Sequence, residues 1–170
     1  MYEPLNKYKI ENIVVKEVEY QDGEALNLSK ELMFFHNKNK FRPELTRLQQ
    51  LFNDYLKYAL HAPGIRDTYL DRAYSNEFLI VLMTNMETHK RINDFIENLK
   101  TPKINKAEFN LQITSEYILL LAKDMKGLVA GVDTIEEILR ETFEDFFRQK
   151  KFDDYIKIRP LKLLNCKNKE

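Results

Sequence analysis

The clearest secondary-structure pattern of the chain lies in FNLQITSEYILLLAKDMKGLVAGVDTIEEI, residues 109–138. Apolar and polar residues alternate over Phe109–Ile113, and after a polar Thr-Ser-Glu turn a second apolar run covers Tyr117–Ala122. Two such runs joined by a short loop predict a β-hairpin. From Gly127 to Gln149 the apolar residues recur at helical spacing. The second strand is therefore expected to lead into a long amphipathic helix.

The first 40 residues carry two apolar clusters on either side of an Asp-Gly turn signal. The clusters cover residues 10–18 and 26–35. Each predicts a strand, although the spacing of the second cluster also fits a helix, and periodicity alone does not decide between the two. Residues 41–61 place apolar side chains on one face and charged ones on the other, with Pro43 in the first turn. This segment is expected to be a helix.

Two further segments lie between this helix and the hairpin. Phe78–Met83 is a continuous apolar run, which is typical of a strand that is covered on both faces and lies centrally in a sheet. Residues 88–99 are amphipathic and too polar for a core strand. A short helix or an ordered loop is expected there, ending before Pro102. Beyond the long helix, residues 152–164 have a mixed pattern that is extended around Pro160.

The composition excludes several classes of function. A chain of 170 residues fits one domain. Its 27 Lys and Arg balance its 27 Asp and Glu, so no global field attracts nucleic acid or an anionic membrane. There is no run of about 18 apolar residues to span a bilayer, and no apolar signal core follows Met1. As written, the sequence is that of a soluble cytoplasmic protein; for a fragment of an exported enzyme, localisation is not determined.

The side chains that usually carry chemistry form no recognisable catalytic or metal-binding set. The single cysteine, Cys166, has no partner for a disulfide or a metal knuckle. The three histidines lack a ligand at zinc-site spacing and are interpreted as structural or surface residues: His36, His61 and His89. The sequence contains neither a Gly-rich phosphate loop nor a nucleophile elbow. We therefore assign no catalytic, metal-binding or cofactor-binding residue, and no cofactor.

The charged clusters of the last helix are interpreted as solvated surface. Its acidic residues lie mostly opposite the apolar stripe, which predicts a face exposed to water: Glu136, Glu137, Glu141, Glu144 and Asp145. A glycosidase-type pair needs two carboxylates held about 5 to 10 Å apart across a cleft, which one helix face does not supply. The basic residues Arg148, Lys150 and Lys151 are followed at once by acidic residues and are expected to form a solvated helix end.

Residues 109–138 resemble the end of the small α+β domain that precedes the catalytic barrel in glycoside hydrolase family 20, the β-N-acetylhexosaminidases, with relatives before the barrels of families 67 and 84. That domain has an alternating strand, a turn, a second strand ending in Ala, an acidic residue, and then Gly, three residues, Gly, two residues and Thr. The matching positions are Phe109, Leu111, Ile113, Ile118, Leu120, Ala122, Asp124, Gly127, Gly131 and Thr134. The family's aromatic pair between the glycines is missing, because Leu128-Val129-Ala130 stands there, and Glu136-Glu137 stands where a Gln is usual.

The structural motif of this resemblance is Gly127, Gly131 and Thr134. Gly127 lets the chain turn away from the sheet edge, and Gly131, one turn later, lets the helix lie close to the strands. The resemblance implies an α+β fold, a mixed β-sheet with two main amphipathic helices packed on it in a zincin-like topology. It also implies one accessory domain over residues 1–170, with 152–170 as a connector toward a catalytic barrel.

The resemblance implies a non-catalytic domain that packs against and stabilises a TIM-barrel catalytic domain of the same polypeptide, because the family's catalytic Asp-Glu pair lies in the barrel. An exposed apolar docking face is then expected, which allows the isolated domain to form a homo-oligomer. The alternative is a stand-alone carbohydrate- or protein-interaction module with the same fold. Its candidate binding aromatics are Tyr55, Tyr58, Tyr69 and Tyr74, although Tyr55 also suits the core. An independent enzyme is disfavoured, because no nucleophile, base and orienting group can be assembled.

Overall fold

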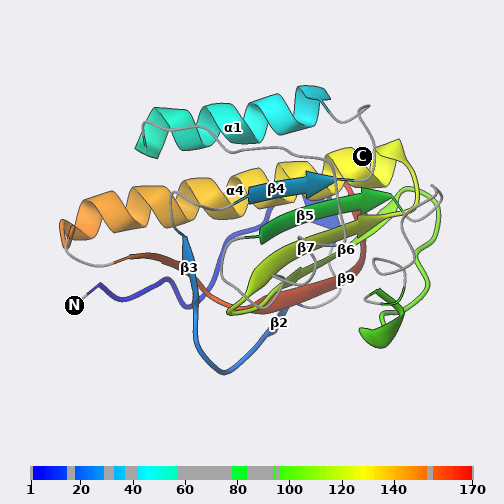
Figure 1. The fold of residues 1–170 in the computed structure, drawn as a ribbon, viewed down its shortest axis with the longest axis horizontal. Helices are drawn as coiled ribbons and strands as arrows, with labels where there is room; N and C mark the ends of the chain where they lie inside the picture. Colours follow the sequence, from blue (N-terminus) through cyan, green and yellow to red (C-terminus); the bar gives the residue numbers. More distant parts are fainter. Residues whose placement is uncertain are drawn as a thin grey trace.

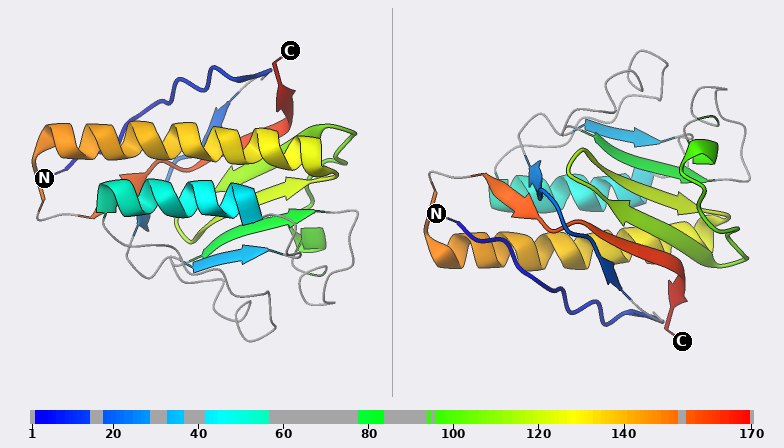
Figure 2. Two further views of the ribbon diagram at one scale, coloured as in Figure 1. Left: turned by 90° about the horizontal axis from the view of Figure 1, so that it is seen from above. Right: turned by 90° about the horizontal axis from the view of Figure 1, so that it is seen from below.

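Two helices lie side by side on one face of a mixed β-sheet (Figure 1). The computed structural model describes residues 2–14, 18–28, 33–36, 42–56, 78–83, 94, 96–152 and 155–169, with the backbone alone over 33–36, 78–83 and at positions 42 and 45. The helices are α1 (Arg42–Leu56) and α4 (Met125–Gln149), and they cover the strands in the view from above, whereas the strands lie in front in the view from below (Figure 2). This arrangement confirms the predicted α+β class.

The described strands form one sheet of seven strands and a separate pair. The order across the sheet is β1-β9-β6-β7-β5-β4, and β2 also pairs with β9. The sheet consists of β1 (Ile13–Val14), β2 (Glu19–Tyr20), β4 (Met33–His36), β5 (Phe78–Met83), β6 (Glu108–Ile113), β7 (Tyr117–Ala122) and β9 (Leu161–Asn168). The separate pair joins β3 (Leu26–Leu28) to β8 (Ile156–Ile158) in antiparallel register.

The β-hairpin predicted from the sequence is confirmed. Strands β6 and β7 pair antiparallel, with Ile113 opposite Ile118. The turn closes because the Thr114 N–H donates to the Tyr117 carbonyl at 2.9 Å. The alternating apolar side chains of β6 lie in the same core cluster as those of α4. The apolar face of the hairpin therefore packs against α4.

The apolar run Phe78–Met83 forms β5, an interior strand of the sheet as predicted. It pairs in parallel with β4 on one side and with β7 on the other. Parallel neighbours need crossover connections instead of tight hairpins. In the chain, α1 lies between β4 and β5 and packs on the helical side of the sheet (Figure 2).

The two helices meet along an apolar seam. Phe52 of α1 packs edge to face against Phe143 of α4, with ring centroids 5.4 Å apart. Beside the seam, Arg47 of α1 donates to Asp133 of α4 at 2.6 Å and also to Glu136. α1 lies within the helix predicted over 41–61, and the described chain of α1 ends at Leu56.

The segment expected to be a connector, residues 152–170, forms strands of the domain. β9 pairs with β1, β2 and β6. At an irregularity of register between Phe109 and Leu111, the N–H of Asn165 donates to the buried side chain of Asn110 at 2.7 Å. β9 therefore holds the amino-terminal strands to the hairpin. That the chain leads on to a barrel stays a prediction.

The two apolar clusters near the amino terminus contribute strands, as expected, but they are divided. Residues 10–18 include β1, and residues 26–35 supply β3 and most of β4, which belong to different sheets. Within the expected short helix at 88–99, the described residues 94 and 96–98 are helical. Several side chains singled out in the sequence lie outside the described residues: Tyr58, Tyr69, Tyr74, His61 and His89. His36 lies in β4, where only the backbone is described.

Within the part of the chain that the structure describes, no helix combines the length and the apolar character that a membrane crossing needs.

Candidate functional site

The residues of the predicted structural motif lie on the buried side of α4. A Cβ added to Gly127 would come within 2.2 Å of the Glu108 carbonyl oxygen, and one added to Gly131 within 2.3 Å of Leu120 Cδ1. Thr134 is fully buried, and its hydroxyl donates to a carbonyl of its own helix at 2.8 Å. At the two glycines the helix lies too close to the hairpin for a Cβ, and the three residues are buried and offer no exposed group to a ligand.

Asp124 fixes the start of α4. One carboxylate oxygen accepts from the Gly127 N–H at 2.9 Å and the other from the Ala107 N–H at 2.9 Å. Burial by itself would raise the pKa of Asp124, but these N–H groups and the nearby Lys106 lower it overall. A single ionised carboxylate thus ties the helix start to the chain just before β6.

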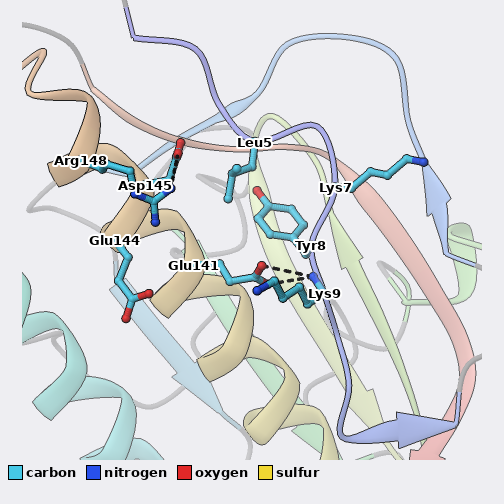
Figure 3. A pocket seen from close by; sticks show the side chains of 8 residues that line it. All are labelled: Leu5, Lys7, Tyr8, Lys9, Glu141, Glu144, Asp145 and Arg148. Atoms are coloured by element: carbon cyan, nitrogen blue, oxygen red, sulfur yellow. Dashed lines mark hydrogen bonds and ion pairs between the residues drawn. The ribbon is translucent and has the colours of Figure 1, made fainter.

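The candidate binding site is a hollow between the amino-terminal segment and the carboxyl-terminal half of α4 (Figure 3). We call residues 2–12 the N-terminal strap, and they form neither helix nor strand. The hollow has a volume of about 340 Å³. It is lined by Leu5, Lys7, Tyr8, Lys9, Glu141, Glu144, Asp145 and Arg148. A second hollow of about 230 Å³ adjoins it and shares Lys9, Glu141 and Glu144.

The strap runs antiparallel to α4 (Figure 2). The Lys9 N–H donates to both carboxylate oxygens of Glu141, at 3.0 and 3.3 Å (Figure 3). One helical turn earlier in α4, Glu137 accepts from the side-chain amide of Asn12. Around Lys9 and Asn12 the strap therefore donates hydrogen bonds to carboxylates of α4 instead of to a neighbouring strand.

Tyr8 is a buried residue of the hollow, with 6% of its surface exposed. Its hydroxyl oxygen accepts from the Arg159 N–H at 3.0 Å, and its own N–H donates to the Tyr20 hydroxyl oxygen at 2.8 Å. Burial is the main cause that raises the pKa of Tyr8 above its ordinary value. Tyr8 is therefore a neutral anchor for the strap.

The prediction that the acidic residues of α4 face water is wrong for most of them. Glu144 is exposed, but Asp145 is only 8% exposed. The remaining three are half-buried: Glu136, Glu137 and Glu141. The physical reason is that the strap lies over part of this face and an arginine of α1 reaches another part. Both neighbours are distant in sequence, so the pattern within α4 did not reveal them.

The hollow can bind polar or charged groups, but its side chains are not arranged for catalysis. Its carboxylates all come from one helix, and Asp145 is paired with Arg148 at 3.5 Å. Among the described residues, no three His, Cys, Asp or Glu side chains are placed to hold a metal ion. Cys166 is buried, and that burial raises its pKa to about 11, which makes it a poor nucleophile. We assign no step of a reaction to these residues.

Exposed aromatic residues lie close together in the sequence where α4 ends, and we call Phe147, Phe152 and Tyr155 the aromatic end patch. They are 37%, 61% and 60% exposed, and the rings of Phe147 and Phe152 are 5.9 Å apart. Exposed basic residues stand between these aromatic residues in the sequence: Arg148, Lys150 and Lys151. Tyr55, the one described candidate from the sequence, is half-buried with its ring 5.2 Å from Phe143. Sequence reasoning missed this patch, although its aromatic residues flank a basic run.

This strand order, with both main helices on one face of the sheet, defines an α+β domain of a kind that occurs inside longer chains. Solved structures of longer chains contain a similar fold. A protein named CpGH84D matches with a TM-score of 0.64 at 10% identity, over 94% of this chain and 24% of its own. The GH20 exo β-N-acetylglucosaminidase from Vibrio harveyi, in complex with N-acetylglucosamine, matches with a TM-score of 0.51 at 11% identity, over 98% of this chain and 19% of its own.

At these identities the likeness shows the fold, and the chain spans about a quarter and a fifth of the length of the two solved chains. The resemblance to families 20 and 84 that residues 109–138 indicate is thus confirmed at the level of fold. No protein-family model matches the chain. No curated protein matches it.

Proposed function

We propose that this chain is a non-catalytic accessory domain of a glycoside hydrolase similar to the β-N-acetylhexosaminidases. In this proposal it packs against and stabilises a TIM-barrel catalytic domain of the same polypeptide. The observation that carries the proposal is the asymmetry of the structural match. Nearly the whole of this chain corresponds to a small share of a longer chain, once in a GH84-named protein and once in a GH20 exo β-N-acetylglucosaminidase.

The aromatic end patch supports the proposal as a docking face. Among the described residues four large apolar side chains are exposed, and three of them belong to this patch. Aromatic residues and arginine are enriched in the centres of protein interfaces, while single exposed apolar residues are ordinary. The facing surface of the barrel is expected to combine apolar and acidic side chains, because exposed basic residues accompany the aromatic ones in the sequence.

The test compares residues 1–170 with the natural polypeptide that carries them. The isolated chain should give no turnover of a chromogenic β-N-acetylhexosaminide, whereas the natural polypeptide should hydrolyse it. In the natural polypeptide, Phe152→Ser should lower the melting temperature of the catalytic domain. Val14→Ser is the matched control, since Val14 is an exposed apolar residue on β1 instead of at the end of α4.

Two results contradict the proposal. One is hydrolysis by the isolated chain. The other is a reading frame that stops directly after Glu170, which would leave no barrel to dock. An unchanged melting temperature of the Phe152→Ser polypeptide would instead reject the patch as the docking face while leaving the domain assignment in place.

The alternative function is a stand-alone carbohydrate- or protein-interaction module. The observation that favours it is the exposure of Phe152 and Tyr155, because accessible aromatic rings can stack on sugar rings. Calorimetric titration of the isolated chain with N-acetylhexosamine oligomers separates the two functions. Heat of binding that disappears in Phe152→Ser supports the module, and the absence of heat supports the accessory domain.

A further inference from the structure

The N-terminal strap is an irregular segment held by side chains instead of by a β-ladder. At one end Tyr2 is buried and packs edge to face on Phe146, with centroids 5.0 Å apart. At the other end the Asn12 carbonyl accepts from the Lys169 N–H at 3.0 Å, just beyond β9. Between these ends, α4 accepts hydrogen bonds from the N–H groups of Glu3 and Lys9, whereas Tyr8 is bonded to Tyr20 and Arg159. The bonds from Glu3, Lys9 and Asn12 to α4 are exposed to solvent, and segments held by exposed bonds open locally at lower free energy than the core.

The strap carries backbone strain close to its contact with α4. Ile10 has a φ of 45°, in the left-handed region, and is 8% exposed. A β-branched residue in that region is strained, typically by about 1 to 3 kcal/mol, and persists only where its surroundings hold it. The burial of the Ile10 side chain supplies part of that hold. The balance between a bound and an open strap is therefore sensitive to small changes nearby.

Glu137 lies beneath this strained section. One of its carboxylate oxygens accepts from Asn12, and the other is buried without a hydrogen-bond partner among the described residues. Negative groups face it from both elements: Glu11 on the strap, and Asp133 and Glu141 on α4. The cations lining the same hollow are Lys9 on the strap and Arg140 on α4, and Arg140 is already paired with Glu136 at 2.9 Å.

We propose that the N-terminal strap is an acid-tightened latch, in which proton uptake by Glu137 removes the charge repulsion beneath residues 9–12 and fixes them on α4. A neutral carboxyl leaves no buried, unpartnered charge at this point. It also ends the repulsion with Glu11 and Glu141, while the bond from the Lys9 N–H to Glu141 is kept. The device is built from the strap and α4 alone and does not depend on the proposed function.

The pKa of Glu137 is shifted in the direction that the latch requires. Burial is the largest cause that raises the pKa of Glu137, followed by the charges of Glu141, Glu11 and Asp133, and the Asn12 bond opposes them. A group whose folded pKa is raised binds more protons in the folded state, so its contribution to stability grows as the pH falls toward the folded pKa. The latch is therefore weaker at neutral pH and tighter in mild acid.

The test is hydrogen exchange of the Lys9 amide in the full chain, expressed as protection after correction for the intrinsic rate. It is measured at about pH 7.5 and about pH 5.5, both above the ordinary glutamate pKa of about 4.3. We expect protection to rise several-fold at the lower pH. In Glu137→Gln, a neutral side chain of the same shape, protection should be high at both pH values. Glu144→Gln removes an exposed charge of the same helix and should keep the wild-type response.

The proposal is overturned by protection that is equal or lower at the lower pH. The proposal is also overturned if the Lys9 amide of Glu137→Gln shows the same increase in protection at the lower pH as wild type. Should Glu137→Gln fail to fold, Glu11→Gln gives an independent answer, since it removes one facing charge from the strap. A reduced pH response in Glu11→Gln supports the latch, and an unchanged one rejects it.

Discussion

Substitution of Gly127 by alanine is the sharpest test of how the long helix is seated on the hairpin. The added Cβ would lie 2.2 Å from the Glu108 carbonyl oxygen, about 1.2 Å inside the 3.4 Å at which ordinary contact begins. It would also lie 2.9 Å from the Glu108 carbonyl carbon and 3.3 Å from that of Ala107. All of these atoms belong to backbone. No side-chain rotation can relieve the overlap, so the first turn of α4 must move away from β6.

The magnitude follows from that displacement. Overpacking against fixed neighbours typically costs about 1 to 3 kcal/mol, and the upper end applies here because backbone must shift. Moving the turn also weakens the bonds from Gly127 and Ala107 to Asp124, while the better helix propensity of alanine returns about 1 kcal/mol. We expect a net loss of about 3 kcal/mol. For a chain of this length that corresponds to a melting temperature lower by about 6 to 12 °C.

The assay is thermal and urea unfolding of wild type, Gly127→Ala and Gly131→Ala. Gly131→Ala is the matched control, because its Cβ would meet a side chain, Leu120, at 2.3 Å. A rotamer shift of that leucine costs about 1 kcal/mol, which the gain in helix propensity largely offsets. We expect Gly131→Ala to stay within about 1.5 kcal/mol of wild type. If Gly127→Ala is as stable as wild type, or if Gly131→Ala loses more stability, then the backbone contact at Gly127 does not determine how α4 lies on the hairpin.

Three further predictions concern single side chains. Asp124→Ala should lower the free energy of unfolding by about 1 to 2 kcal/mol at neutral pH through loss of the helix cap. Because the pKa of Asp124 is lowered in the folded chain, the difference in unfolding free energy between this variant and wild type, measured in urea, should shrink as the pH falls below about 4. Phe143→Ala should cost about 3 to 5 kcal/mol in the same assay, whereas exposed Phe152→Ser in the isolated chain should change stability by less than about 0.5 kcal/mol. Cys166, buried and with its pKa raised to about 11, should react with a thiol reagent at about pH 8 only after unfolding, and rapid reaction in the native state would contradict its burial.

The elements that local patterns determine could be predicted from the sequence. The hairpin follows from alternation over Phe109–Ile113 and the apolar run after it, and α4 follows from helical spacing between Gly127 and Gln149. The interior position of β5 follows from its unbroken apolar run. In each case the residues that decide the structure are neighbours in the chain, and periodicity reports which faces are buried.

The features that depend on distant partners could not be predicted. Residues 161–168 have a mixed pattern in the sequence, yet they form β9. This strand pairs with β1, β2 and β6, all of which are distant from it in the sequence. The partial burial of Glu137 and Glu141 depends on a strap more than 120 residues away in sequence. The aromatic end patch likewise needs the path of the chain after α4, which no periodicity in Phe147–Tyr155 encodes.

Whether this fold packs on a catalytic barrel of the same polypeptide can be decided on the natural protein itself. The natural protein carrying this sequence should be purified from its source, its intact mass determined, and its activity measured on a chromogenic β-N-acetylhexosaminide. We expect a polypeptide several hundred residues longer than 170, with turnover that the isolated chain lacks. A natural protein that ends with this chain, or a longer one without glycosidase activity, would contradict it.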